Sequence, residues 1–193
     1  MKFWKKPTPD QVDKAVALLG RPAHHRYFFD RLDNPEWVKP LIEKGFFRNP
    51  PAVVEDEKER TIAFPPWPES RYLARVAPMA SAEAQAAIFE AIQRVPDTEN
   101  SRVSQDLLEA AIALPPDFSV KLVGKAIGWA RAKYPLPLPE KLAELIAHLA
   151  QGGHVKEALN LARETLEVLP DPRKPPEVSP EEAFLLSDRK SVV

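Results

Sequence analysis

Prolines divide this chain into short segments, and most of these segments repeat their apolar residues with the spacing of a helix. The sequence contains 22 prolines and only six glycines. Proline ends one helix or begins the next, because its ring fixes φ and its nitrogen carries no hydrogen to donate. Between the prolines, apolar residues recur at positions i, i+3 and i+4, which is the spacing of one helical face. The chain is therefore restricted to short helices that pack on one another.

From Ser70 onward the expected helices come in pairs. We expect helices at residues 70–80, 81–95, 101–114, 118–134, 139–150 and 154–169. Leu73, Leu108 and Leu145 stand at matching places in the first member of each pair, 35 and 37 residues apart. A helix–turn–helix unit of this length is typical of a solenoid, in which each unit buries its apolar face on its neighbours. We predict an all-α fold, with a right-handed α-α superhelix of about three helical-hairpin repeats over residues 70–170.

Residues 1–69 differ from the paired segments and are predicted to form a small aromatic-rich and proline-rich module. Helices are expected at residues 8–19, 22–32 and 35–44. β-Branched residues at Val53–Val54 and Thr61–Ile62 flank an acidic stretch. Such a pattern on both sides of a polar loop predicts a β-hairpin, at about residues 52–64.

The last residues are expected to be a linker and the beginning of another helix, followed by a foreign tail. Residues 171–187 hold the linker, and Ser179-Pro180-Glu181-Glu182 has the N-cap, proline and acidic first turn of a helix start. Read back into codons, Asp188–Val193 resembles a sequencing-library adapter that runs into a stop codon. We therefore expect residues 188–193 to be an artefact and the native protein to continue past Ser187.

Charge and composition argue against several classes of partner. The net charge is −1, which gives no overall basic field, so we do not expect nucleic-acid binding. The chain contains no cysteine, which excludes disulfides and thiolate metal sites. No stretch has the apolar length of a membrane span, and the basic start lacks the apolar core of a signal peptide. We expect a cytoplasmic protein without a membrane partner.

The histidines do not have the spacing of a metal site. His24 and His25 are adjacent, so on a helix their side chains point about 100° apart and cannot both bind one ion. His148 and His154 are six residues apart, with no Asp or Cys near them in sequence. No phosphate-binding glycine loop, dinucleotide fingerprint or nucleophile motif occurs. We therefore predict no catalytic residue, no metal and no cofactor in this chain.

Aromatic and arginine residues gather before residue 73, and their pattern leaves two interpretations open. Aromatic residues and arginines dominate the energetic centres of protein interfaces, so the set predicts a possible interaction patch. The alternative is that the aromatics form a core on which the arginines stack. The core interpretation is favoured, because so many large rings cannot all stay exposed. The set consists of Arg26, Tyr27, Arg31, Trp37, Trp67, Arg71 and Tyr72.

Two resemblances support the helical architecture. Residues 22–170, with Arg26-Tyr27-Phe28-Phe29, Gly45-Phe46-Phe47 and Phe64-Pro65-Pro66-Trp67, resemble the amino-terminal region of large uncharacterised bacterial helical-repeat proteins. The last helix pair is similar to a tetratricopeptide repeat, although Ile146 and Thr165 stand where that motif has small residues. The earlier pairs lack the turn glycine and resemble HEAT repeats. The positions that carry the tetratricopeptide likeness are Leu142, Leu145, Leu149, Gly153, Ala158, Ala162 and Pro170.

Together these features predict a non-catalytic scaffold or sensor segment that mediates protein–protein interaction, as the N-terminal part of a longer protein. A solenoid offers an extended concave surface to partners. An alternative hypothesis is an accessory or regulatory region of a large bacterial enzyme, nucleotide-driven or nucleic-acid-processing and connected with defence, whose catalytic domain lies elsewhere. Under that hypothesis the full-length protein is an enzyme, while this part of it is not.

Overall fold

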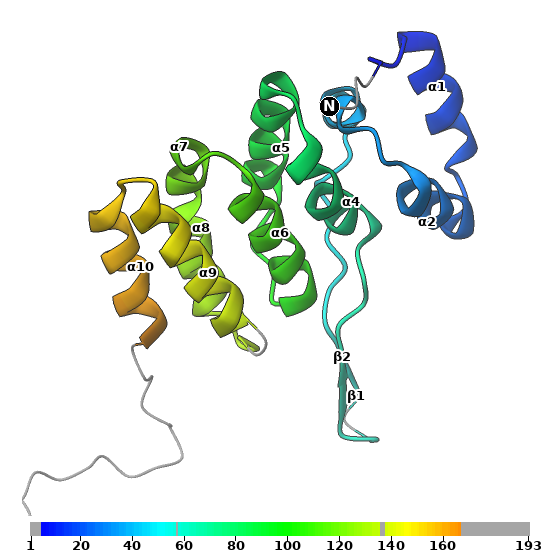
Figure 1. The fold of residues 1–193 in the computed structure, drawn as a ribbon. Coiled ribbons are helices and arrows are strands. Elements are labelled where there is room, and N and C mark those ends of the chain that lie inside the picture. The colour runs from blue at the N-terminus through cyan, green and yellow to red at the C-terminus, as the bar shows by residue number, and fades with distance from the viewer. Residues whose placement is uncertain (1–4, 57, 136–137, 167–193) are drawn as a thin grey trace, which may run out of the picture.

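The computed structural model describes residues 5–56, 58–135 and 138–166, and within them the chain is mostly helical (Figure 1). The linker and the helix start expected at 171–187, together with residues 188–193, lie outside the described residues. The elements of residues 5–79 are α1 (Pro9–Leu18), α2 (Pro22–Arg31), η1 (Pro35–Trp37), α3 (Val38–Glu43), β1 (Val54–Asp56), β2 (Thr61–Ala63), α4 (Pro68–Val76) and η2 (Ala77–Met79). Those of residues 82–166 are α5 (Ala82–Arg94), α6 (Ser101–Ala113), α7 (Pro116–Ser119), η3 (Val120–Leu122), α8 (Val123–Ala130), α9 (Leu138–Gln151) and α10 (Val155–Leu166).

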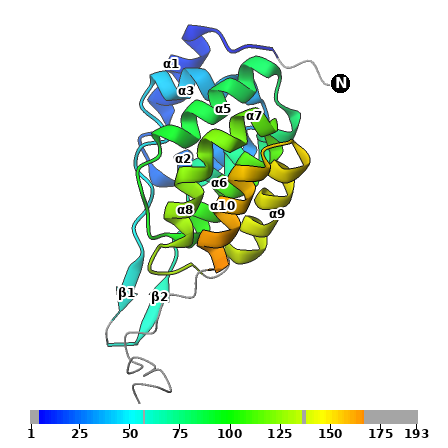
Figure 2. The ribbon, with the colours of Figure 1, turned by 90° about the vertical axis from the view of Figure 1, so that its left-hand side faces the viewer.

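The helices form two layers that run side by side along the molecule (Figures 1 and 2). In one layer α2 packs on α4, α4 on α6, and α6 on α9. In the other layer α3 packs on α5, α5 on α7, and α8 on α10. The three recurring leucines, Leu73, Leu108 and Leu145, are fully buried in α4, α6 and α9, which follow one another in the first layer.

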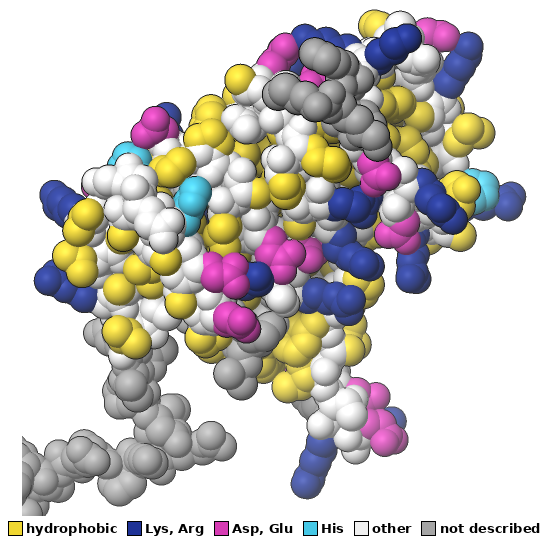
Figure 3. Space-filling view, viewed as in Figure 1, with side chains coloured by type: hydrophobic (Ala, Val, Ile, Leu, Met, Phe, Trp, Pro, Cys, Tyr) yellow, Lys and Arg dark blue, Asp and Glu magenta, His cyan; other side chains and the backbone are white. Residues whose placement is uncertain are grey.

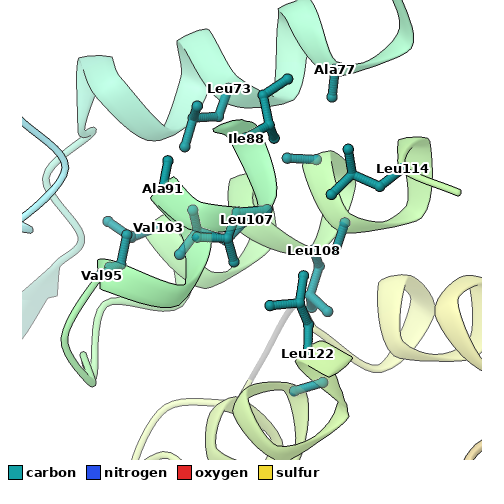
Figure 4. Close-up of a cluster of buried hydrophobic side chains, with 14 of the residues drawn as sticks. Leu73, Ala77, Ile88, Ala91, Val95, Val103, Leu107, Leu108, Leu114 and Leu122 are labelled. Atoms are coloured by element: carbon teal, nitrogen blue, oxygen red, sulfur yellow. The ribbon is translucent and has the colours of Figure 1, made fainter. Parts of the chain in front are cut away.

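The core lies between the two layers, and its centre is made by α4, α5 and α6 (Figure 4). Leu73 of α4, Ile88 of α5 and Leu107 of α6 are all fully buried. Each of these helices buries one stripe of apolar side chains, as the spacing of its sequence predicts. The same connected cluster of buried residues extends from Phe29 to Leu161 and so joins the N-terminal helices to the last ones.

Capping side chains and prolines define the starts of several helices. The Thr8 hydroxyl accepts from the Gln11 amide, and the Gln11 side chain accepts from the Thr8 amide, which makes a complete capping box for α1. The Ser81 hydroxyl accepts from the Ala84 amide at the start of α5. Proline occupies the first position of α1, α2 and α4, where its missing N–H leaves no helical bond unmade.

The single long helix expected at residues 118–134 is wrong. The structure has three shorter pieces there, α7, η3 and α8, and the last of them ends at Ala130. The Ser119 hydroxyl is buried and donates to the Ala111 carbonyl, 2.7 Å away, which holds the α7 end against α6. Pro135 keeps the residue before it out of the helical region, so the chain leaves the helix before Tyr134.

The expected hairpin is present as two short antiparallel strands, with Val54 opposite Ala63 and Asp56 opposite Thr61. The Asp56 side chain accepts from the amides of Lys58 and Glu59, at 2.9 and 3.0 Å, and shapes the turn. Both strands are exposed, and the hairpin projects from the helical layers (Figure 1).

The hairpin is tied back to the end of α8 by its first strand. The Glu55 carboxylate accepts from Lys133 Nζ and from the Tyr134 hydroxyl, both at 2.9 Å. The Phe64 ring lies edge-on to the Tyr134 ring, with the centroids 5.6 Å apart. The hairpin therefore has a fixed place beside the loop that follows α8.

One buried asparagine holds the ends of the hairpin region to the start of α6. Asn100 Nδ2 donates to the carbonyls of Pro51 and Pro65, at 3.0 and 2.9 Å, while its Oδ1 accepts from the Arg102 amide. All the polar atoms of this buried side chain are therefore satisfied.

Trp67 immediately precedes α4 and is buried, with 4% of its surface exposed. Replacing Trp67 with Ala should lower the free energy of unfolding by about 3–5 kcal/mol, because the cavity cannot be refilled by the surrounding core. Chemical denaturation followed by circular dichroism measures this loss. The exposed Tyr27 is the matched aromatic control, and Tyr27→Ala should change stability by less than about 0.5 kcal/mol. Wild-type stability of the Trp67→Ala protein would contradict the core position.

A half-buried carboxylate lies at the contact between α4 and α6. Asp106 Oδ2 accepts from the buried Ser70 hydroxyl, 2.6 Å away. Burial raises the pKa of Asp106 to about 6, against the lowering effects of the Ser70 hydrogen bond and of Arg71 and Arg102, and Glu109 raises it further. The folded protein therefore favours the protonated acid more strongly than the unfolded chain does.

This raised pKa predicts a specific pH dependence of stability. The contribution of Asp106 is fully present below its unfolded pKa of about 4 and is lost as the pH rises through about 6. Asp106→Asn keeps an acceptor for Ser70 and does not titrate. The variant should match the wild type near pH 4 and exceed its stability at pH 7 by about 1–3 kcal/mol. Denaturation curves across this range test the prediction, and parallel curves for the two proteins would refute it.

Candidate interaction groove

The structure divides the seven residues of the predicted patch between the core and separate surfaces. Trp67 and Tyr72 are buried, and Trp37 is half-buried with its ring edge-on to Phe28, 5.7 Å between centroids. The Tyr72 hydroxyl donates to the Asn34 carbonyl, 2.7 Å away. These three rings therefore belong to the interior or its margin, and Tyr72 packs α4 against α2.

The remaining members of the predicted patch are exposed. Tyr27 shows 66% of its surface, and the Arg31 guanidinium lies over its ring, 5.7 Å from the centroid. Arg26 pairs with Asp30 one turn along α2, at 3.6 Å. Arg71 lies exposed on α4, on the side of Asp106. Of the predicted set, only Tyr27 and Arg31 come together on one open surface.

Tyr27 and Arg31 form one side of a groove between α1 and α2. We name it the α1–α2 groove, and its volume is about 500 Å³. Figure 3 shows hydrophobic side chains at the surface over these two helices. The groove is lined by Ala15, Leu18, Leu19, His24, Tyr27, Phe28, Arg31 and Leu32.

The turn between the two helices sets the shape of the groove. Helix α1 ends at Leu18 and α2 begins at Pro22, so only three residues, 19–21, connect them. His24 Nδ1 lies 3.1 Å from the Leu18 carbonyl, so its N–H tautomer donates to the open end of α1. Of the residues in α1, only Val12 is buried. The apolar side chains in the C-terminal half of α1 are therefore exposed or only half-buried.

Two large apolar side chains are exposed in this groove. Leu18 shows 69% of its surface and Tyr27 shows 66%. Isolated exposed leucines are common, but a contiguous apolar hollow at a surface marks a place where another molecule packs. The groove thus has the chemistry of a docking surface.

The edge of the groove carries positive charge. Arg31 contacts the Tyr27 ring, and Arg21 lies exposed in the connecting turn. Among the described residues, neither arginine forms a salt bridge. An acidic group brought to this edge would therefore find cations without a competing partner.

The histidines lie apart and each has its own partner. His24 contacts the Leu18 carbonyl, whereas His25 Nε2 lies 3.1 Å from Glu69 Oε1, so the adjacent pair faces two different surroundings. His148 Nε2 lies 3.0 Å from the Leu114 carbonyl, and His154 lies 3.1 Å from Asp117 Oδ1. Within the part of the chain that the structure describes, no group of three or more potential ligands is placed to hold a metal ion.

Two features of these surfaces were missed in the sequence. Leu18 and Leu19 continue the apolar pattern of α1, which indicates burial, yet Leu18 is exposed and Leu19 is only half-buried. Their burial depends on what α1 packs against in the folded chain, which periodicity does not record. Glu69 and His25 are 44 residues apart, and no short motif links them. The one hint in the sequence was that Glu69, an acidic residue, directly follows Pro68. An acidic residue is equally expected in the first turn of an ordinary helix.

Comparison with protein-family models, with curated proteins and with solved structures finds no match to this chain. Among residues 5–56, 58–135 and 138–166, no helix has both the length and the apolar character needed to cross a membrane.

The exposure of the groove predicts that its residues affect binding more than stability. Leu18→Asn should change the free energy of unfolding by less than about 0.5 kcal/mol, because a solvated side chain contributes little to the fold. The same change should reduce the fluorescence of the anionic apolar dye anilinonaphthalene sulfonate, which the wild-type groove should bind beside Arg31. Val54→Asn, on the exposed hairpin, is the control and should leave dye binding unchanged. Equal dye signals from all three proteins would show that the groove does not bind apolar ligands.

Proposed function

We propose that this chain is a non-catalytic helical scaffold or sensor segment that mediates protein–protein interaction through the α1–α2 groove. The observation that carries the proposal is the exposure of Leu18 and Tyr27 in an apolar hollow of about 500 Å³. The lining offers apolar packing and cationic contacts, which suit the recognition of another chain. Within this proposal the protein acts in the cytoplasm.

The partner that fits the groove is an amphipathic helix. Helices dock in grooves between two helices by inserting apolar side chains at i, i+3, i+4 and i+7. Leu18, Leu19 and Phe28 supply the matching apolar lining. Arg21 and Arg31 favour an acidic residue beside the apolar face of that helix, because they have no salt-bridge partner among the described residues. The groove therefore selects an apolar helix with acidic flanks.

The proposal includes a repeat architecture for the layered helices. We infer that residues 70–170 form helical-hairpin repeats, HEAT-like at first and similar to a tetratricopeptide repeat at the end, wound into a right-handed superhelix. Its support is that Leu73, Leu108 and Leu145 are buried at equivalent places in three successive helices of one layer. Gly153, with φ of 88°, makes the turn between α9 and α10 that the last unit requires.

Site-specific photo-crosslinking in the cell of origin tests the proposed interaction. Benzoylphenylalanine placed at Leu18 or at Tyr27 should give a covalent adduct with one protein. Mass spectrometry should locate the crosslink in an amphipathic segment with acidic residues. The same probe at the exposed Met79, on η2, is the control and should not give this adduct.

Charge reversal provides the second arm of the test. Arg31→Glu should reduce the adduct yield about tenfold or more, because an attractive contact with an acidic residue becomes a repulsive one. Circular dichroism should show that the variant keeps its fold. The absence of an adduct at both groove positions, or the same adduct from Met79, would reject the groove as the contact surface.

A further inference from the structure

A second hollow lies on a different side of α2, where α2, the loop at residues 44–51 and the start of α4 meet. We name it the Glu69 cleft, and its volume is about 490 Å³. This size is within the usual range of small-molecule sites. The cleft is lined by His25, Lys44, Gly45, Phe46, Phe47, Arg48, Asn49, Pro51, Pro66, Trp67, Pro68 and Glu69.

The cleft contains a buried carboxylate that is only half satisfied. The Glu69 side chain is 8% exposed. Its Oε1 lies 3.1 Å from His25 Nε2, which donates in the tautomer that carries the proton there. Its Oε2 is buried and has no hydrogen-bond partner within the described residues. A native structure rarely keeps such an atom without a reason, because its lost hydration is not compensated.

The loop that forms one wall of the cleft is held in an unusual backbone conformation. Gly45 and Phe47 both have positive φ, 86° and 65°. The left-handed region is unfavourable for a bulky residue, and Phe47 adopts it while its ring is buried in the core. This anchoring fixes the positions of Phe46 and Arg48, which flank Phe47 and line the cleft.

Arg48 supplies a charge opposite to that of Glu69. It is exposed, and among the described residues it makes no ion pair or hydrogen bond. The other cation of the lining, Lys44, is paired with Asp13 at 2.5 Å. The lining of the cleft thus contains one carboxylate oxygen and one cation that have no partner among the described residues.

We propose that the Glu69 cleft binds a small zwitterion of the α-amino-acid class. Its ammonium group donates to the Glu69 carboxylate, and its carboxylate pairs with Arg48. A simple cation would meet the repulsion of Arg48, and a simple anion would meet that of Glu69, so a ligand with both charges fits best. This proposal is independent of the α1–α2 groove. The two sites share helix α2 but have no lining residue in common.

The aromatic residues of the cleft favour a compact ligand over a flat ring system. Trp67 is almost completely buried, and Phe46 is stacked on His25, with centroids 6.0 Å apart and 17° between planes. Neither ring therefore offers an open face for stacking a base. These rings instead provide apolar contact for the side chain of the bound molecule.

Calorimetric titration of the purified chain with each of the common L-amino acids tests the proposal. At least one of them should bind with one-to-one stoichiometry and raise the melting temperature. Sodium acetate and methylammonium chloride, each of which carries one of the two charged groups, should bind at least about tenfold more weakly.

Variants of the two unpartnered groups assign the binding to this cleft. Arg48→Met and Glu69→Gln should each weaken binding about tenfold or more. Arg163→Met, a matched change of an exposed arginine on α10, should have no effect. Because Arg48 is exposed, the Arg48→Met variant should keep the fold. It therefore tests whether the ligand binds in this cleft even if Glu69→Gln reduces stability.

The proposal is overturned by any of three results. These are a lack of binding by every amino acid, binding of acetate or methylammonium that equals that of the best amino acid, and unchanged affinity in Arg48→Met.

Discussion

Helix α4 has to pack on both of its sides, and the rest of the molecule is arranged around this requirement. Leu73 and Val76 are buried in the core that α4 forms with its neighbours in the stack. Tyr72 is buried next to Phe29 of α2, with ring centroids 5.7 Å apart. The Arg75 guanidinium donates to the Leu32 carbonyl at the end of α2, at 3.0 Å. Because α4 contacts α2 on one side and its neighbours in the stack on the other, it joins the N-terminal helices to the layers that follow.

The two candidate surfaces are a consequence of how α2 lies on α4. His25 and Phe29 are four residues apart and face inward, toward Glu69 and Tyr72. Tyr27 and Arg31 are also four residues apart, and they lie on the outer face of the same helix. One helix therefore contributes His25 to the Glu69 cleft and an exposed aromatic–cation pair to the α1–α2 groove.

Sequence patterns predict most of the helices and the hairpin, because apolar spacing, caps and prolines act over a few residues. They do not separate Trp67 from Tyr27, since both are aromatic and both stand beside apolar neighbours. Which of them is buried depends on the partner that each element meets in the folded chain. The pairing of His25 with Glu69 joins residues that are 44 apart in sequence. The break of the helix at residues 120–122 follows the contact of Ser119 with α6, so no local pattern shows either feature.

The packing of each helix on elements close to it in the chain has a consequence for how the protein folds and opens. Contacts between near neighbours require little loop closure, so folding can begin in the centre and extend outward one helix at a time. Helix α10 packs mainly on α8 and α9, and it leaves Val155, Leu159 and Leu166 exposed. Its amides should therefore exchange with solvent through local fraying, while those of α4 and α6 exchange only when the whole structure unfolds.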